Sequence, residues 1–142
     1  MNPELARVLK HELTHSFLRS LAGGHCPAWL NEGLAQLMEP RSSSAFASQL
    51  AVLFQQQKAI PFPALEGSFI RFADVQAQVA YAESLSGVEY LRQRYGMNEV
   101  VRMLRNIGSG VEPEMALRQS TGMDYSGFQR RIGEYLAKDG GD

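Results

Sequence analysis

Apolar residues recur at intervals of three and four along most of the chain, and this spacing constrains the fold more than any other feature. It is typical of amphipathic helices, whose buried face returns about every 3.6 residues. Cap and turn residues delimit the expected helices: 3–21, 27–39, from the capping serines 42–44 to 57, 73–95, 98–107, 113–120 and 125–137. No long segment alternates between apolar and polar residues, and β-forming residues gather only at 68–72. The pattern predicts a mainly α fold of about six to seven helices with little or no sheet.

The bulk composition sets the size of the fold and excludes some partners. A chain of 142 residues with 44% apolar content can bury one core but is short for two domains, so we expect residues 1–142 to form a single domain. Fourteen basic and fifteen acidic side chains offer no basic surface for nucleic acid. No apolar run approaches the roughly 20 residues that span a bilayer. Cys26 is the single cysteine, which excludes an internal disulfide framework and leaves the compartment open.

A short motif in the first expected helix points to a metal site. Residues 11–15 read His-Glu-Leu-Thr-His, and positions i and i+4 share one face of a helix, so His11 and His15 can bind one Zn²⁺. Glu12 is rotated by about 100° from His11 and can accept a proton from a water that zinc activates. Leu13 is expected to point into the core. The same five-residue pattern also occurs by chance on ordinary surface helices. A third metal ligand elsewhere in the chain is therefore needed to distinguish a zinc site from a chance match.

Catalytic zinc sites have three protein ligands and one open position. A third histidine six residues after His15 would indicate a metzincin, but Leu18 and Leu21 stand where that class has its glycine and its histidine. A glutamate on the following helix is the other option, and Glu32 provides one. Asn31 beside it and Gln36 one turn later are candidates to orient the metal ligands.

The residues around Glu32 carry a family resemblance. The segment from Trp29 to Ala35, Trp-Leu-Asn-Glu-Gly-Leu-Ala, resembles the second-helix motif of the zinc aminopeptidases, and residues 9–39 resemble the peptidase MA-like domains. The resemblance implies the helical half of a zincin-like metallopeptidase domain of the gluzincin type. It also implies that Zn²⁺ is bound by His11, His15 and Glu32. Sixteen residues separate the second histidine from the glutamate, slightly fewer than in the aminopeptidases, which indicates a shorter connection.

A second part of the resemblance concerns Tyr81, in the expected helix 73–95. The aminopeptidases carry a Tyr-Xaa-Lys-Gly motif there, whose tyrosine stabilises the oxyanion of the tetrahedral intermediate. Tyr81 aligns with that tyrosine, whereas Glu83 and Ser84 replace the lysine and the glycine. The resemblance therefore implies that Tyr81 is a second catalytic residue.

Other assignments for this role stay open. Thermolysin-like enzymes use a histidine, but no histidine follows His25 in this chain, so a tyrosine is the available donor. Tyr90 and Tyr95 lie in the same expected helix and are competitors for the role. Tyr81 could instead be a half-buried packing residue.

Two functions from different classes fit these observations. The first is a zinc-dependent peptidase that hydrolyses a peptide or protein substrate with Glu12 as general base. The second is a zinc-stabilised, catalytically weak protein-interaction module. Glu12 favours chemistry, because zinc sites built for stability usually close the fourth position with another ligand.

The segment before the motif favours the second reading. The ten residues that precede His11 cannot hold the sheet whose edge strand pairs with the substrate backbone in zinc-helix proteases. We therefore expect either that the domain is part of a longer protein or that its substrate platform is built differently. The Gly-Xaa-Met-Glu-Asn strand with which the aminopeptidases recognise a free amino terminus is also absent. The sequence leaves cleavage specificity and oligomeric state open.

Overall fold

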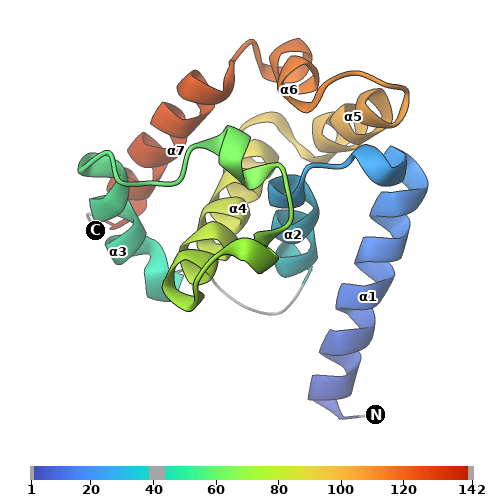
Figure 1. Ribbon diagram of the computed structural model, residues 1–142, viewed down its shortest axis with the longest axis horizontal. Coiled ribbons are helices and arrows are strands. Elements are labelled where there is room, and N and C mark those ends of the chain that lie inside the picture. Colours follow the sequence, from blue (N-terminus) through green and yellow to red (C-terminus); the bar gives the residue numbers. More distant parts are fainter. Residues whose placement is uncertain (1, 39–43, 141–142) are drawn as a thin grey trace.

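The computed structural model describes residues 2–38 and 44–140, with side chains except at 6–11, 44–46 and 139–140. These residues form helices and contain no strand, which confirms the mainly α fold (Figure 1). The elements are α1 (Pro3–Ala22), η1 (Gly23–His25), α2 (Ala28–Leu37), α3 (Ser44–Gln55), η2 (Phe62–Leu65), η3 (Phe69–Arg71), α4 (Asp74–Tyr95), α5 (Met97–Gly108), α6 (Pro113–Thr121) and α7 (Tyr125–Gly140), where η marks a 3-10 helix.

Helix α4 crosses the middle of the molecule, and the other elements are arranged around it (Figure 1). It packs against α2, α5 and α7, while α3 packs on α7 and α6 on α5. Helix α1 packs against α2 and α5, and its amino-terminal half extends away from the rest of the molecule. The segment 56–73 runs in front of α4 and α2. This arrangement places α1, α2 and α4 in sequence across one side of the fold.

Local sequence signals set most helix boundaries. The Asn2 side chain accepts a hydrogen bond from the Leu5 N–H at 2.7 Å, and Asp124 accepts one from the Gly127 N–H at 2.8 Å. Gly96, with φ 90°, ends α4. We expected Asn98 to cap the next helix, but α5 begins at Met97 and Gly96 itself is the N-cap residue. The expected boundaries at 39–43 lie outside the described residues.

The core is built around a cluster of aromatic rings. Trp29, Phe62 and Phe128 are fully buried, with ring centroids 5.3 Å apart for Trp29–Phe62 and 4.8 Å apart for Phe62–Phe128. Because these rings come from α2, η2 and α7, they join the segment 56–73 to both helices. Trp29 therefore anchors α2, the helix that carries Glu32.

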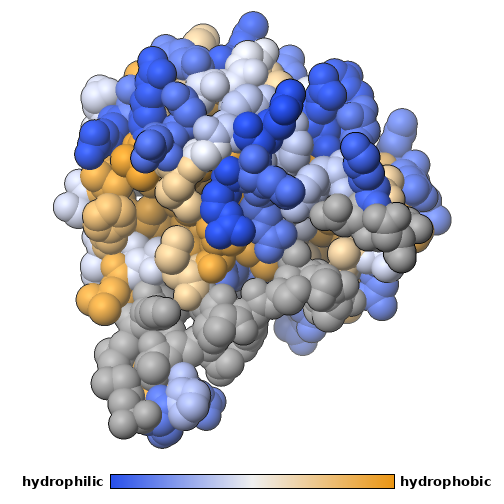
Figure 2. Space-filling view, turned by 180° about the vertical axis from the view of Figure 1, so that it is seen from behind, coloured by the Kyte–Doolittle hydropathy of each residue, from blue (hydrophilic) through white to orange (hydrophobic). Residues whose placement is uncertain are grey.

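One prediction about α1 was wrong. Leu13 does not point into the core: it is 67% exposed, and Phe17 on the same face is 58% exposed. The helix makes its contacts with α2 and α5 through another face, where Leu18 and Ala22 are buried. Figure 2 shows hydrophobic side chains gathered on the side of the molecule where α1 lies.

The residues at 68–72, which have high β-propensity, also adopt a different structure from the one that their composition favours. They contain η3 at Phe69–Arg71, opened by the Ser68 hydroxyl, which accepts a hydrogen bond from the Ile70 N–H at 3.3 Å. Among the helices that the structure describes, none is long and apolar enough to cross a membrane.

Candidate metal centre

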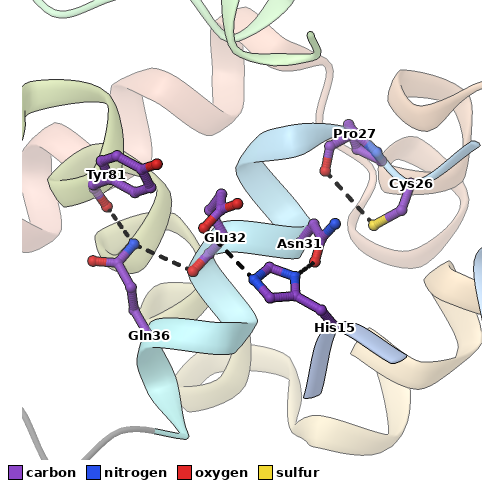
Figure 3. A network of polar contacts seen from close by, with 7 residues as sticks. All are labelled: His15, Cys26, Pro27, Asn31, Glu32, Gln36 and Tyr81. Carbon is purple, nitrogen blue, oxygen red and sulfur yellow. Dashed lines mark hydrogen bonds and ion pairs between the residues drawn. The ribbon is translucent and has the colours of Figure 1, made fainter. Parts of the chain in front are cut away.

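The turn between α1 and α2 brings a histidine and a glutamate together. His15 Nε2 lies 3.9 Å from Glu32 Oε2, and both side chains are largely shielded from solvent (Figure 3). The expected helix spacing thus puts the second histidine of the motif and the glutamate of the following helix at one place. Their separation is within the span of two ligands of one ion, because each Zn²⁺–ligand bond is about 2.0–2.2 Å.

Asn31 sets the orientation of the His15 ring. His15 Nδ1 lies 2.5 Å from Asn31 Oδ1 (Figure 3). An amide oxygen can only accept a hydrogen bond, so Nδ1 carries the hydrogen and donates it. In the neutral ring, Nε2 then keeps its lone pair on the side that faces Glu32. This is the tautomer that binds a metal through Nε2, and an outer hydrogen bond of this kind is typical of metal-binding histidines.

Close packing of α2 on α4 determines where Glu32 lies. A Cβ atom added to Gly33 would lie 2.4 Å from the Ser84 backbone oxygen and 2.5 Å from Val88 Cγ2. Only glycine leaves room for these two helices at this distance. The glycine that follows Glu32 therefore lets α2 approach the part of α4 that contains Tyr81.

Tyr81 lies beside Glu32 and is joined to it by a polar link. The Gln36 side-chain amide donates to the Tyr81 backbone oxygen at 2.9 Å and to the Glu32 backbone oxygen at 3.2 Å (Figure 3). Burial and then the Glu32 charge raise the pKa of the Tyr81 phenol. The hydroxyl therefore stays protonated at neutral pH and can donate a hydrogen bond. The ring packs edge-on against Phe69, with centroids 5.2 Å apart, and the residue is 40% exposed.

The two competing tyrosines of α4 lie elsewhere. Tyr90 and Tyr95 pack against each other, with ring centroids 6.4 Å apart, and Tyr90 also contacts Tyr135 of α7. Neither of them lines the pocket beside Glu32. Of the three tyrosines in this helix, Tyr81 is the one that adjoins the candidate site.

The structure describes only part of the predicted ligand set. The backbone of His11 lies in α1, one turn before His15, but its side chain is outside the described part. Glu12 is exposed on the same helix. Among the described side chains, no group of three His, Cys, Asp or Glu residues is close enough to hold a metal ion. The three-ligand site therefore stays a prediction, of which the structure brings together His15 and Glu32.

A pocket of about 620 Å³ adjoins Glu32 on the side of Tyr81. Its wall is formed by residues of the turn before α2, of α2 itself, of the segment between η2 and α4, and of α4: Cys26, Ala28, Asn31, Glu32, Glu66, Ser68, Phe69, Ile70, Phe72, Ala77 and Tyr81. We did not predict the contribution of Glu66 or of residues 68–70 and 72. No local motif marks them, and their high β-propensity was the one available signal.

Burial keeps two ionisable side chains, those of Cys26 and Glu83, in their protonated forms. Cys26 lines the pocket, and burial raises the pKa of its thiol to about 12, so it remains a thiol and not a nucleophilic thiolate. Glu83, which replaces the lysine of the aminopeptidase motif, is completely buried, and its Oε1 accepts a hydrogen bond from the Ile60 N–H at 2.6 Å. Burial raises the pKa of this carboxyl to about 8. Glu83 therefore holds the loop before η2 and does not face the pocket.

Comparison with known proteins identifies the family. Searches of curated proteins and of solved structures gave no match. A family profile described as the Peptidase MA superfamily matches residues 4–138, which include all the elements around the candidate site. The match covers nearly the whole chain, so this protein belongs to the Peptidase MA superfamily.

Proposed function

We propose that this chain is a zinc-dependent peptidase of the gluzincin type, with His11, His15 and Glu32 as metal ligands. The observation that carries the proposal is the distance of 3.9 Å between His15 Nε2 and the Glu32 carboxylate. The other ring nitrogen, Nδ1, is hydrogen-bonded to Asn31 and therefore leaves Nε2 as the metal-binding atom. One carboxylate and neutral imidazoles form the donor set of a catalytic zinc site. The backbone of His11 lies in α1 one helical turn before His15, and residues four apart share one face of a helix.

The residues around this site can carry the steps of peptide hydrolysis. Bound zinc acts as a Lewis acid that lowers the pKa of water and polarises a carbonyl group. Glu12 accepts a proton from the attacking water and then donates it to the leaving amine. The Tyr81 hydroxyl, protonated at neutral pH, donates a hydrogen bond to the oxyanion that develops on the substrate. The hydrogen bond from the Gln36 side chain to the Tyr81 backbone oxygen holds this part of α4 against α2.

Metal content tests the ligand set. Protein loaded with zinc and then freed of excess metal should retain about one zinc per chain, and Glu32→Ala should lose it because a primary ligand is removed. Inductively coupled plasma mass spectrometry gives the ratio. Glu112→Ala is the control, since Glu112 is exposed and precedes α6, away from the site. Absence of zinc from the folded parent protein would reject the metal site.

Glu12→Gln separates catalysis from metal binding. We expect this variant to retain zinc, because Glu12 is not a ligand, and to lose at least about 100-fold in peptide hydrolysis, because the general base is removed. The measurement is the cleavage rate of a mixture of unstructured peptides, followed by mass spectrometry, beside the zinc content of both proteins. Equal cleavage by the folded variant would reject the role of Glu12. Zinc binding without cleavage by the parent protein would favour the interaction module instead.

A further inference from the structure

The charged side chains that line the pocket beside Glu32 are acidic. Among the described residues that line it, Glu32 and Glu66 carry carboxylates, and there is no lysine, arginine or histidine. If Glu32 binds a metal, its charge is compensated there. Glu66 is then the remaining charged side chain on the pocket wall, and it favours a cationic group on whatever the pocket binds.

Glu66 is held in place by a buried hydrogen-bond chain. The Tyr125 hydroxyl donates to Glu66 Oε2 at 2.7 Å, and the Trp29 indole N–H donates to the Tyr125 hydroxyl oxygen at 3.1 Å. Trp29 is fully buried and Tyr125 nearly so, which fixes the donor. Burial first, and then the Glu66 hydrogen bond, raise the pKa of Tyr125, so its hydroxyl remains a donor.

The backbone of Glu66 is fixed to the helix of the metal site. Its carbonyl oxygen accepts a hydrogen bond from the N–H of Ala28, the first residue of α2, at 2.9 Å. Glu66 and Glu32 are therefore attached to the same helix, and the distance between them is set by the fold. A carboxylate that is already ordered loses little side-chain entropy when it binds a ligand.

We propose that Glu66 binds a cationic group of the peptide substrate, an ammonium or a guanidinium, in the pocket beside Glu32. This inference rests on the peptidase function proposed above. The apolar side chains of Phe69, Ile70 and Phe72 line the same pocket and suit the aliphatic stem of lysine or arginine. The same charge could also be supplied by the free amino terminus of a peptide. The pocket therefore selects substrates by positive charge.

Binding to a protein that cannot turn over its ligand tests this selection. Zinc-loaded Glu12→Gln protein is titrated calorimetrically with N-acetylated hexapeptides that carry lysine or its neutral analogue norleucine at each position in turn. One norleucine peptide with a free amino terminus is added to the set. We expect at least one charged peptide to bind about fivefold tighter than its neutral counterpart, and the preference to weaken as salt is raised.

Matched variants connect the preference to Glu66. Adding Glu66→Gln should abolish the difference between charged and neutral peptides, whereas Glu112→Gln, an exposed glutamate outside the pocket, should leave it unchanged. Tyr125 is a positioning residue in this scheme. Tyr125→Phe should reduce the preference for charge but leave the affinity for norleucine peptides unchanged, which a general loss of structure would not do.

The outcomes separate the two proposals. A gain for lysine peptides identifies a side-chain site, and a gain only for the free amino terminus identifies a terminus site; both support the role of Glu66. Equal binding of charged and neutral peptides, or a preference that survives Glu66→Gln, overturns this inference and leaves the peptidase function intact. Failure of the zinc-loaded protein to bind any peptide rejects the peptidase function, and this inference with it.

Discussion

At the scale of single residues, Glu83 stands out because glutamate is normally exposed to solvent, whereas this side chain is buried. It is completely buried in α4, one oxygen accepts a hydrogen bond from the Ile60 N–H, and the other has no hydrogen-bond partner in the described part of the structure. A buried carboxylate is costly unless it is paired, so the folded protein favours the protonated form. This is the physical reason for a pKa of about 8 in place of the ordinary 4.5.

This buried carboxyl predicts how stability depends on pH. The folded state holds the Glu83 proton up to about pH 8, whereas the unfolded state releases it near pH 4.5, so stability falls as pH rises between these values. Glu83→Gln cannot ionise, and its melting temperature should rise relative to that of the parent protein across this interval. Calorimetric melting from pH 4 to 9 measures the difference, with the exposed Glu112→Gln as control. A difference that does not change with pH would show that Glu83 is charged in the folded protein.

At the scale of elements, the contact of α2 with α4 sets the geometry of the site. Alanine is normally more stable than glycine inside a helix by about 1 kcal/mol, so Gly33→Ala would stabilise an isolated α2. In the fold, the added Cβ would collide with the Ser84 backbone oxygen and with Val88. We expect the collision to dominate and Gly33→Ala to destabilise the protein by about 1–3 kcal/mol.

Urea unfolding measures this change, and Gly24→Ala is the matched control. A Cβ atom on Gly24 meets nothing within 4 Å, so that variant should be nearly neutral. Because Glu32 precedes Gly33, displacement of α2 should also weaken zinc binding in Gly33→Ala. Unchanged or increased stability of this variant would mean that the contact between α2 and α4 can accommodate a Cβ atom at position 33.

At the scale of the whole molecule, a metal at the candidate site would join α1, whose amino-terminal half extends away from the other helices (Figure 1), to the centre of the fold. Helix α1 extends from the molecule and contacts α2 and α5, whereas α2 lies against α4 (Figure 1). Ligands on both α1 and α2 would therefore connect the two helices through one ion. A metal that binds the folded state alone adds to its stability.

Removal of zinc should accordingly destabilise the protein. At a free zinc concentration of about 1,000 times Kd, the added stability is about 4 kcal/mol, and a chelator should abolish it. Differential scanning calorimetry with and without chelator gives the shift in melting temperature, and Glu32→Ala should melt alike under both conditions. An identical shift in Glu32→Ala would place the metal at another site.

The sequence by itself determined the helices and the local part of the site. Apolar spacing and caps such as Asn2, Asp124 and Gly96 act over three or four residues, so they can be read without knowledge of the fold. The pairing of His15 with Glu32 followed from two short motifs on consecutive helices joined by a tight turn. The match of the chain to the Peptidase MA superfamily confirms the resemblance that those motifs indicated.

Only the tertiary structure decided which surfaces meet. Leu13 has the spacing of a core residue but is exposed, because α1 packs through another face. Tyr81, Tyr90 and Tyr95 share one helix, and the packing of α2 on α4 places the first of them beside Glu32. Glu66 and Tyr125 are 59 positions apart, and their hydrogen bond depends on how η2 and α7 enclose Trp29. Such contacts result from the simultaneous packing of distant elements, and no short segment of the sequence encodes them.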